Sequence, residues 1–457
     1  MDTLFPKSAS CITIKEEEEL SHEFMKMVRK HFKVIRDPLI VNYVNEIGQK
    51  IVSAFPPQPF EYHFHVIKDH TYNAFAAPAG QIFINSGLFE VMETEEELAG
   101  ILGHEIAHAS CRHISQKIER SSKIGLATLA GIAAGIFLGV GGTAADAISI
   151  GSMAAGQSAS LAYSRENERQ ADQVGLKYMT KAGYSGKGLL VVLKKIRDKE
   201  WFGADIIPQY LTTHPAVNER ITYIEGNLKL ETGNRKLETA NRKPQTANRK
   251  PQTESFKFQR AHARLTAIYG DEDSALQRFE TRVREYPADP AANYGYGLIL
   301  AKTGNRKNAV IHLKKALAEK VFDPYILRDL GVIYYLDGQY QEALNILEGA
   351  ISIEPSDPEG LFFLGRTRME MKDFEAAASV FEELLEKHPD YKQALYFIGE
   401  AYGRQKKFGQ AHYHLGIYYK ERREYKNAVF HLKKALQYIK DADKKLEVEK
   451  MLEGLRG

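Results

Sequence analysis

Cysteine is nearly absent from this chain, whose 457 residues include only Cys11 and Cys111. Two cysteines cannot build a disulfide framework, which excludes a small disulfide-stabilised scaffold. We interpret Cys111 as a small packing residue, and nothing in the sequence supports a bridge to Cys11. Net charge is also nearly absent, at +3, so the composition gives no indication of nucleic acid or of acidic partners.

An apolar leader is missing as well. Residues 1–10 lack the hydrophobic stretch of a signal peptide, and no lipoprotein-type apolar stretch precedes Cys11. Three alternatives remain open: the leader was removed, the start is misplaced, or the protein stays inside the cell.

At 457 residues the chain is too long for one ordinary domain, so we expect two or three domains.

A predicted helix over residues 94–120 carries the clearest chemical motif. It contains Gly-His-Glu-Ile-Ala-His at 103–108, which is the pattern H-E-x-x-H. Because an α-helix has about 3.6 residues per turn, His104 and His108 share one face and can bind one metal ion, while Glu105 is directed at the same space. Apolar residues recur along this helix at helical spacing, so we expect it to be buried.

A catalytic zinc site needs a third protein ligand and leaves a fourth position to water. Downstream, Glu168 and Asp172 are spaced i, i+4 on a second predicted helix. We expect His104, His108 and Glu168 to bind one Zn2+ per chain, and Glu105 to act as general base on the bound water. The alternative is a chance motif on a surface helix with structural histidines. Other divalent ions suit the same donor atoms.

From residue 256 onward the chain repeats with a period of 34 residues, marked by Gly297, Gly331, Gly365 and Gly399. This period predicts tetratricopeptide repeats, which are paired helices that stack into an all-α solenoid with a groove for peptides or other proteins. Gly416 comes only 17 residues after Gly399, so we expect the last unit to be a fused or half repeat.

A polar heptapeptide, Leu-Glu-Thr-Gly-Asn-Arg-Lys at 230–236, recurs with drift as far as residue 257. Its apolar content is too poor for a coiled coil, so we predict a flexible linker over 228–257. Nucleic-acid binding by this basic segment is the alternative, and we expect no nucleic-acid partner.

The two-part motif, Gly-His-Glu-Ile-Ala-His followed by Tyr-Ser-Arg-Glu-Asn-Glu-Arg-Gln-Ala-Asp at 163–172, resembles the zinc peptidases that include the HtpX and CAAX prenyl proteases. With the repeats, the chain is most similar to the BepA-type periplasmic members. The resemblance implies an α+β zincin domain of the gluzincin type, with Glu168 as third ligand. It also implies that Asp172 orients a ligand histidine, which the usual chemistry of metal-bound histidines supports.

Thr-Thr-His-Pro at 212–215 resembles the same family. His214 precedes a predicted helix, where it is either a masking fourth ligand of the metal or a donor to the developing oxyanion. The alternative is a turn residue without a catalytic part.

Residues 73–85 predict a hairpin, and we hypothesise that an extended substrate adds to its strand at 81–84. A purely structural hairpin is the alternative.

A glycine-rich segment at 124–164, in which Asp146 is the one charged residue, separates the two halves of the motif. Its length and Gly-x-x-x-Gly spacing are typical of a transmembrane helix. The number of glycines favours helices that do not span the membrane. They either pack over the site as a lid that keeps it latent or lie on a membrane surface as a peripheral contact.

We therefore expect a zinc metalloprotease domain at 1–227, the linker at 228–257 and the repeat domain at 258–457. The expected function is a zinc endopeptidase, with protein substrates and with protein partners in the repeat groove. By resemblance, the substrates are misfolded or stalled proteins of the bacterial envelope, and the protein is periplasmic or membrane-associated. The alternatives are a chaperone or scaffold with a latent metal site, and a membrane-embedded protease.

Overall fold

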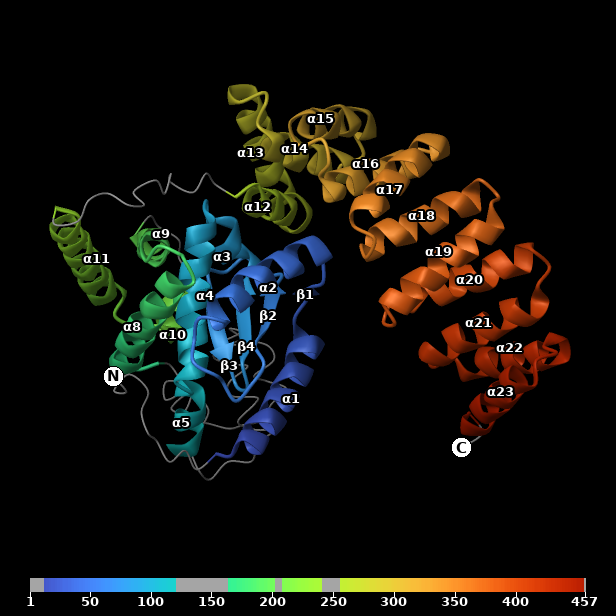
Figure 1. Cartoon of the computed structure of the whole chain (residues 1–457), viewed down its shortest axis with the longest axis horizontal. Helices are drawn as coiled ribbons and strands as arrows, with labels where there is room; N and C mark the ends of the chain where they lie inside the picture. Colours follow the sequence, from blue (N-terminus) through green and yellow to red (C-terminus); the bar gives the residue numbers. More distant parts are fainter. Residues whose placement is uncertain (1–11, 121–162, 202–207, 241–254, 456–457) are drawn as a thin grey trace. The chain divides into compact units, whose positions relative to one another are not determined.

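The computed structural model describes residues 12–120, 163–201, 208–240 and 255–455 (Figure 1). The chain divides into two compact units, 1–274 and 275–457, and each is described by itself. In the part of the chain that the structure describes, no helix is both long and apolar enough to cross a membrane. The predicted lid or membrane segment falls almost entirely on residues 121–162, outside the described residues.

The first unit contains a four-stranded sheet with the order β1 (Val34–Ile35), β2 (His63–Ile67), β4 (Gln81–Asn85) and β3 (Ala74–Ala77). β2 and β4 are parallel, and the two outer pairs are antiparallel. The predicted hairpin at 73–85 is therefore present as β3 and β4. Its second strand lies inside the sheet, however, so the hypothesis that substrate adds at 81–84 is wrong. Among the described residues the edge strands are β1 and β3, and β3 belongs to the hairpin.

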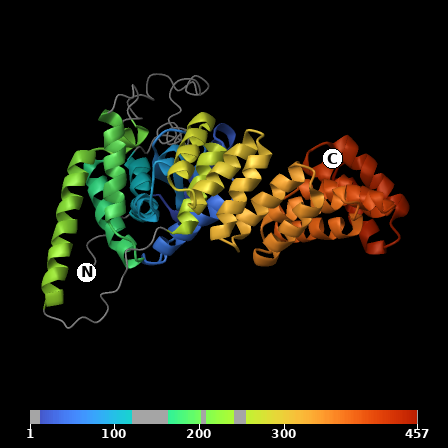
Figure 2. The ribbon, with the colours of Figure 1, turned by 90° about the horizontal axis from the view of Figure 1, so that it is seen from above.

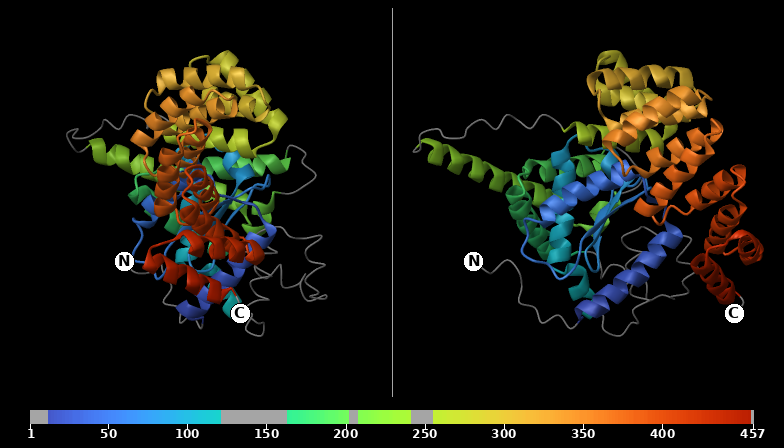
Figure 3. Two further views of the ribbon diagram at one scale, coloured as in Figure 1. Left: turned by 90° about the vertical axis from the view of Figure 1, so that its right-hand side faces the viewer. Right: turned by 45° about the vertical axis from the view of Figure 1, so that its right-hand side comes forward.

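Helices cover both faces of this sheet (Figures 1 and 3). Side chains alternate between the faces along a strand. Phe75 and Phe83 pack on one face against Leu20, Phe24 and Val28 of α1 (Ile14–His31). On the other face lie α2 (Pro38–Val52) and α4 (Glu95–Ser110), with the short α3 (Ser86–Glu90) following β4.

The predicted helix over 94–120 is broken, which corrects the prediction of one continuous element. α4 ends at Ser110 and α5 spans His113–Arg120, because Arg112 adopts a left-handed φ of 54°. Its guanidinium contacts the buried carboxylate of Glu17 in α1 and donates to the Ile12 carbonyl at 3.0 Å. A charge pair 95 residues apart in the sequence thus holds a turn that helical periodicity alone could not reveal.

Close helix packing places the second half of the motif beside the first. α8 (Arg165–Lys181) crosses α4 where two glycines meet, since a Cβ on Gly175 would lie 2.8 Å from the Gly103 carbonyl oxygen. Without a side chain at this crossing, the backbones approach closely enough for α8 side chains to reach the α4 histidines. α9 (Lys187–Trp201) also packs against α4, and α10 (Gln209–Thr213) follows.

Helix α11 runs from Val217 to Ala240. Residues 228–240, the first part of the predicted linker, are therefore helical, and residues 241–254 lie outside the described residues.

The helix α12 (Phe256–Tyr269) lies in the first unit. Phe258 packs between Tyr43 of α2 and Phe89 of α3. Arg264 forms a buried ion pair with Asp37, the residue that caps α2. The boundary at 257/258 that the sequence predicts stays a prediction, but the first helix of the predicted repeat domain packs as part of the first unit.

The second unit consists of stacked helix pairs (Figures 2 and 3). At each pair a glycine of one helix faces a large side chain of the next, as Gly399 faces Leu415 and Gly416 faces Leu432. The helix at 408–421 thus packs against both of its neighbours in the same manner. The helices of this region are α13 (Glu272–Glu285), α14 (Pro290–Lys302), α15 (Arg306–Glu319), α16 (Pro324–Leu336), α17 (Tyr340–Ile353), α18 (Pro358–Glu370), α19 (Phe374–Lys387), α20 (Gln393–Arg404), α21 (Phe408–Glu421), α22 (Tyr425–Tyr438) and α23 (Ala442–Gly454).

Candidate metal centre

Four buried side chains from three parts of the first unit converge at α4. They are His104 and His108 of α4, Glu168 of α8, and His214, which directly follows α10. One possible ligand atom from each lies within 4.8 Å of those of the others, and all four residues are at most 1% exposed. The Nε2 atoms of His104 and His108 are 3.0 Å apart, as the i, i+4 spacing predicts.

The hydrogen bonds around each histidine determine where its lone pair points. Asp172 Oδ1 lies 2.8 Å from His104 Nδ1 and can only accept, so His104 keeps a proton on Nδ1, and in its neutral form the ring directs the Nε2 lone pair at the centre. Cys111, near the end of the same helix, is buried and unbridged, as expected of a packing residue.

A chain of three groups sets the proton of His108 in the same way. Gln170 Oε1 accepts from His113 Nε2 at 3.0 Å, which leaves His113 Nδ1 as an acceptor. His108 Nδ1 lies 2.9 Å from that atom and donates to it. His108 therefore also presents an Nε2 lone pair to the centre. The turn at Arg112 makes this contact available, because it brings α5 back toward α4.

His214 is held in a third arrangement of this kind. The hydroxyl of Thr213 donates to the carbonyl oxygens of Gln209 and Tyr210, at 3.3 and 3.2 Å, so its oxygen accepts from His214 Nδ1 at 2.8 Å. The ring of Tyr210 stacks on His214 with centroids 4.2 Å apart. Neutral His214 thus has no proton on Nε2, which lies 3.5 Å from Glu105 Oε1.

Arg220 of α11 balances the negative charge behind the ligands. Its guanidinium forms two hydrogen bonds of 2.8 Å with Asp172, and its Nη1 lies 2.6 Å from Glu168 Oε2. Burial alone would raise the pKa of each carboxyl, but the Arg220 charge outweighs it and keeps the pKa of both below their usual ranges. Both groups are therefore carboxylates at neutral pH. Tyr223 also donates to Asp172.

The two α4 histidines respond oppositely to their surroundings. Burial and Arg220 lower the pKa of His104, but the carboxylates of Asp172 and Glu168 outweigh them and raise it to about 9. Burial, together with the neighbouring His104, takes the pKa of His108 well below its usual range.

The donor set fits a divalent metal ion. Three imidazole nitrogens and a carboxylate converge in a buried space, and this donor set is one that a divalent cation satisfies. Both oxygens of Glu105 and of Glu168, and the Nε2 of His214, accept no well-formed hydrogen bond from the described residues. Nitrogen and carboxylate ligands in a group of four suit zinc.

Several contributors to this centre were missed by the sequence interpretation. Arg220 had a signal, because it lies on the apolar face of its helix with Val217 and Ile221, where an arginine needs a buried partner. His113 and Thr213 had none, since their roles depend on a turn and on a loop whose placement is tertiary. Every residue predicted for the site, including Asp172 and His214, lies in the cluster or directly against it.

Comparison with known proteins places these residues in a family domain. Residues 39–228 match the model of Peptidase family M48, and residues 270–324 and 334–396 match models of the tetratricopeptide repeat. All of the site residues described above lie within the first match.

Curated relatives share this region. The beta-barrel assembly-enhancing proteases of Yersinia pestis and Escherichia coli (strain K12) are each 26% identical to this chain, over 47% of it and 44% of their own length. The mitochondrial metalloendopeptidase OMA1 of Schizosaccharomyces pombe is 27% identical over 40% of this chain and 51% of the relative. The chain thus spans about half the length of the curated relatives it matches.

Solved structures resemble the repeats. MamA from Desulfovibrio magneticus RS-1 is 21% identical and covers 37% of this chain and 95% of its own, with a TM-score of 0.34. YrrB, described as a TPR protein with an unusual peptide-binding site, is 23% identical, with coverages of 42% and 91% and a TM-score of 0.30. At these TM-scores the likenesses carry no argument about function.

Proposed function

The chain carries a peptidase family M48 domain followed by tetratricopeptide repeats, and from this premise we propose that it is a zinc-dependent endopeptidase whose repeats bind protein substrates or partners. One observation carries the proposal. Four ligand atoms lie within 4.8 Å of one another in a buried cluster, and the carboxylate of Glu105, which accepts no hydrogen bond from the described residues, lies beside them. A purely structural zinc site has no need of such a carboxylate.

In this proposal His104, His108 and Glu168 hold one Zn2+. When bound, the ion supplies Lewis-acid chemistry, polarising a carbonyl oxygen and lowering the pKa of water. Glu105 takes the proton of the attacking water and passes it to the leaving amine. Asp172 keeps the proton of His104 on Nδ1, and Arg220 keeps Asp172 and Glu168 ionised.

His214 has two roles open to it, and its hydrogen bonds favour one. Because the Thr213 oxygen accepts a hydrogen bond from His214 Nδ1–H, the neutral ring offers its Nε2 lone pair toward the centre, which suits a fourth ligand. Donation to an oxyanion would require a second proton on the ring. We infer that His214 masks the metal in this conformation, which supports a latent site, and this observation also favours the alternative of a chaperone or scaffold.

The edge strand β3 is the proposed docking strand for substrate. β3 packs beside α4 and has no strand on its outer side among the described residues. An extended peptide can add there through main-chain hydrogen bonds. The hydroxyl of Tyr163 donates to the outward carbonyl of Ala76 at 3.4 Å, and the strand is buried, so a docking peptide would have to displace this contact.

The wider biology is proposed from the relatives' printed names. Beta-barrel assembly-enhancing proteases suggest a role in the bacterial envelope, and we propose misfolded or stalled envelope proteins, including outer-membrane proteins, as substrates. A periplasmic or membrane-associated location follows from the same proposal.

The test compares Glu105→Gln with wild type at equal zinc content, using degradation of unfolded casein. We expect zinc binding to persist and cleavage to fall about 10²-fold or more. Glu166→Gln is the matched control, because this exposed residue of α8 lies two positions from Glu168 and should leave cleavage unchanged. Equal cleavage by wild type and Glu105→Gln would overturn the proposed base. Failure of zinc-loaded wild type to cleave would favour the latent scaffold.

A further inference from the structure

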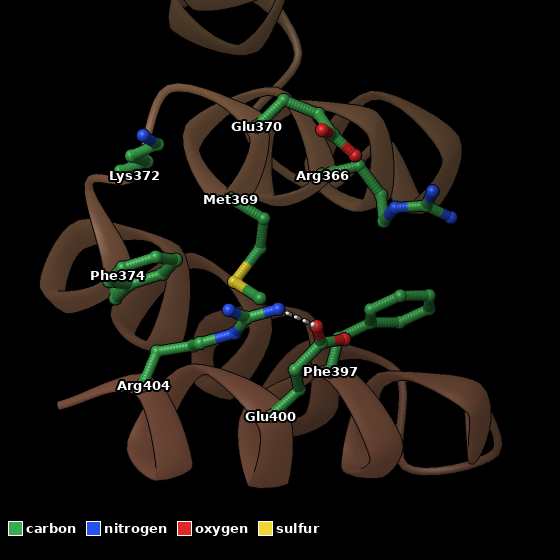
Figure 4. Close-up of a pocket in the computed structure, with 8 residues that line it drawn as sticks. All are labelled: Arg366, Met369, Glu370, Lys372, Phe374, Phe397, Glu400 and Arg404. Atoms are coloured by element: carbon green, nitrogen blue, oxygen red, sulfur yellow. Dashed lines mark ion pairs between the residues drawn. The ribbon is translucent and has the colours of Figure 1, made fainter. Parts of the chain in front are cut away.

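A pocket of about 370 Å³ lies between neighbouring repeats of the second unit. Helices α18 and α20 form two of its walls, and Phe374 at the start of α19 closes one side (Figure 4). Met369 and Phe397 give it an apolar interior, and charged side chains surround that interior. The pocket thus joins apolar and charged surface within the size range of a few amino-acid side chains.

Arg366 is the distinctive group in this pocket. Its guanidinium carbon lies 4.5 Å from the ring centre of Phe397, 5.5 Å from that of Tyr335 and 5.9 Å from that of Phe362. Rings on several sides restrain the planar guanidinium, so less conformational entropy is lost when it binds an acceptor. Among the described residues no carboxylate lies within ion-pair distance of it.

The other charges of the pocket leave a positive balance. Arg404 pairs with Glu400 at 3.6 Å, as the dashed line in Figure 4 marks, so these two charges cancel. Arg366 and Lys372 face one further carboxylate, that of the exposed Glu370, which leaves a net charge of +1. Neither cation is paired with a carboxylate in the part of the chain that the structure describes.

Aromatic contacts continue past the pocket on both sides. On one side, Tyr335 of α16 contacts Phe363 of α18 with ring centres 5.4 Å apart. On the other side, Tyr396 of α20 contacts Tyr418 of α21 at 5.5 Å. A bound chain therefore finds apolar surface before and after the pocket. This arrangement suits an internal segment, which continues on both sides, better than it suits the end of a chain.

We propose that this pocket binds an internal peptide segment of a protein partner in which an Asp or Glu lies beside an aromatic side chain. The carboxylate takes the two parallel donors of Arg366, and the aromatic ring enters the space beside Met369, Phe374 and Phe397. This inference rests on the proposed partner-binding role of the repeats, and it is independent of peptide-bond cleavage.

The test measures binding of a fluorescein-labelled peptide to the full chain by fluorescence anisotropy, in a Glu105→Gln background so that the probe stays intact. The probe has one Asp between two Phe in a Gly-Ser chain with an amidated end. We expect the same peptide with Asn to bind about tenfold more weakly, and Arg366→Gln to weaken the Asp probe equally. Arg366→Lys should also weaken it, since lysine lacks the planar fork.

Arg368→Gln is the matched control. It removes the same charge from the same helix, but Arg368 pairs with Glu348 and Asp373 and does not line the pocket. Equal binding of the Asp and Asn probes would overturn the proposal, as would wild-type affinity in Arg366→Gln or no binding by wild type. If an Asn probe with a free C-terminal carboxylate bound more tightly than the amidated Asp probe, the proposal that the pocket binds an internal segment would be wrong. None of these binding results bears on casein cleavage, so the peptide-binding proposal and the peptidase proposal can each fail without the other.

Discussion

A single arginine neutralises the buried carboxylates behind the metal centre. Arg220 is 1% exposed and contacts both Asp172 and Glu168, which are fully buried. Removing one partner of such a group leaves uncompensated charge in a medium that solvates it poorly, and this usually costs about 3–5 kcal/mol. The arginine therefore supports the fold of the centre as well as the charge of its ligands.

We expect Arg220→Met to destabilise the metal-free protein by about 3–5 kcal/mol, because the two carboxylates lose their counter-charge. Zinc should offset part of this loss by neutralising Glu168 directly. Urea unfolding with and without zinc measures both effects. Arg165→Met is the matched control, since Arg165 forms an exposed ion pair with Glu219 that contributes at most about 1 kcal/mol. Equal effects of the two substitutions would contradict this account.

Thr213 supplies a second residue-scale prediction. Thr213→Val keeps the shape of the side chain but removes the oxygen that accepts from His214 Nδ1. The histidine then loses its tautomer preference, and we expect zinc affinity to fall about tenfold. Competition with a chelator measures the affinity. Thr213→Ser keeps the oxygen and should have the zinc affinity of wild type. A wild-type zinc affinity in Thr213→Val would exclude His214 as a ligand.

The residues that periodicity could place were those on one helix. The i, i+4 spacing predicted that His104 and His108 meet, because that contact is local. Glu168 came from the requirement for a third ligand, supported by a family resemblance. Thr213 and Arg220 follow His104 in the sequence by 109 and 116 residues. Their contacts with the centre therefore depend on a fold that hydrophobic patterns do not specify.

At the scale of elements, helix and strand positions followed from the sequence while their ends and neighbours did not. The sequence indicated a hairpin at 73–85, but a hairpin says nothing about the order of the strands in the sheet. The parallel pairing of β2 with β4 places β3 at the edge. Similarly, the end of α4 depends on Glu17, which no local pattern connects to Arg112.

The edge position of β3 leads to a prediction about substrate affinity. Ala76 pairs with Ile82 without exchanging hydrogen bonds with it, since its carbonyl faces outward toward Tyr163. Ala76→Pro removes the outward N–H, a change that edge strands tolerate. We expect KM for a model peptide to rise several-fold with a smaller change in kcat.

Ala76→Gly controls for the altered side chain, because it keeps the N–H. Zinc content of both variants, measured after purification, reports whether the centre is intact. A KM for Ala76→Pro equal to that of Ala76→Gly would rule out β3 as the docking strand.

At the scale of the whole molecule, the change from peptidase to repeats does not coincide with the start of the repeating sequence. The 34-residue period reaches back into α12, yet α12 packs on α2 and α3 of the first unit. The ring contacts of Phe258 with Tyr43 and Phe89 and the Arg264–Asp37 ion pair are buried contacts of the first unit. Sequence periodicity records a shared helical pattern, whereas the packing partner depends on which apolar surface is available.

We therefore expect Phe258→Ala to destabilise the peptidase unit, although it lies in a helix with repeat-like sequence. Removing a fully packed phenylalanine ring costs about 3–5 kcal/mol. Phe381→Ala is the matched variant, because Phe381 is equally buried in the core of the second unit. In the full chain, Phe258→Ala should lower the urea concentration at which zinc is released, and Phe381→Ala should leave it unchanged while lowering the helical unfolding transition. Zinc release at the wild-type urea concentration in Phe258→Ala would instead assign α12 to the repeats.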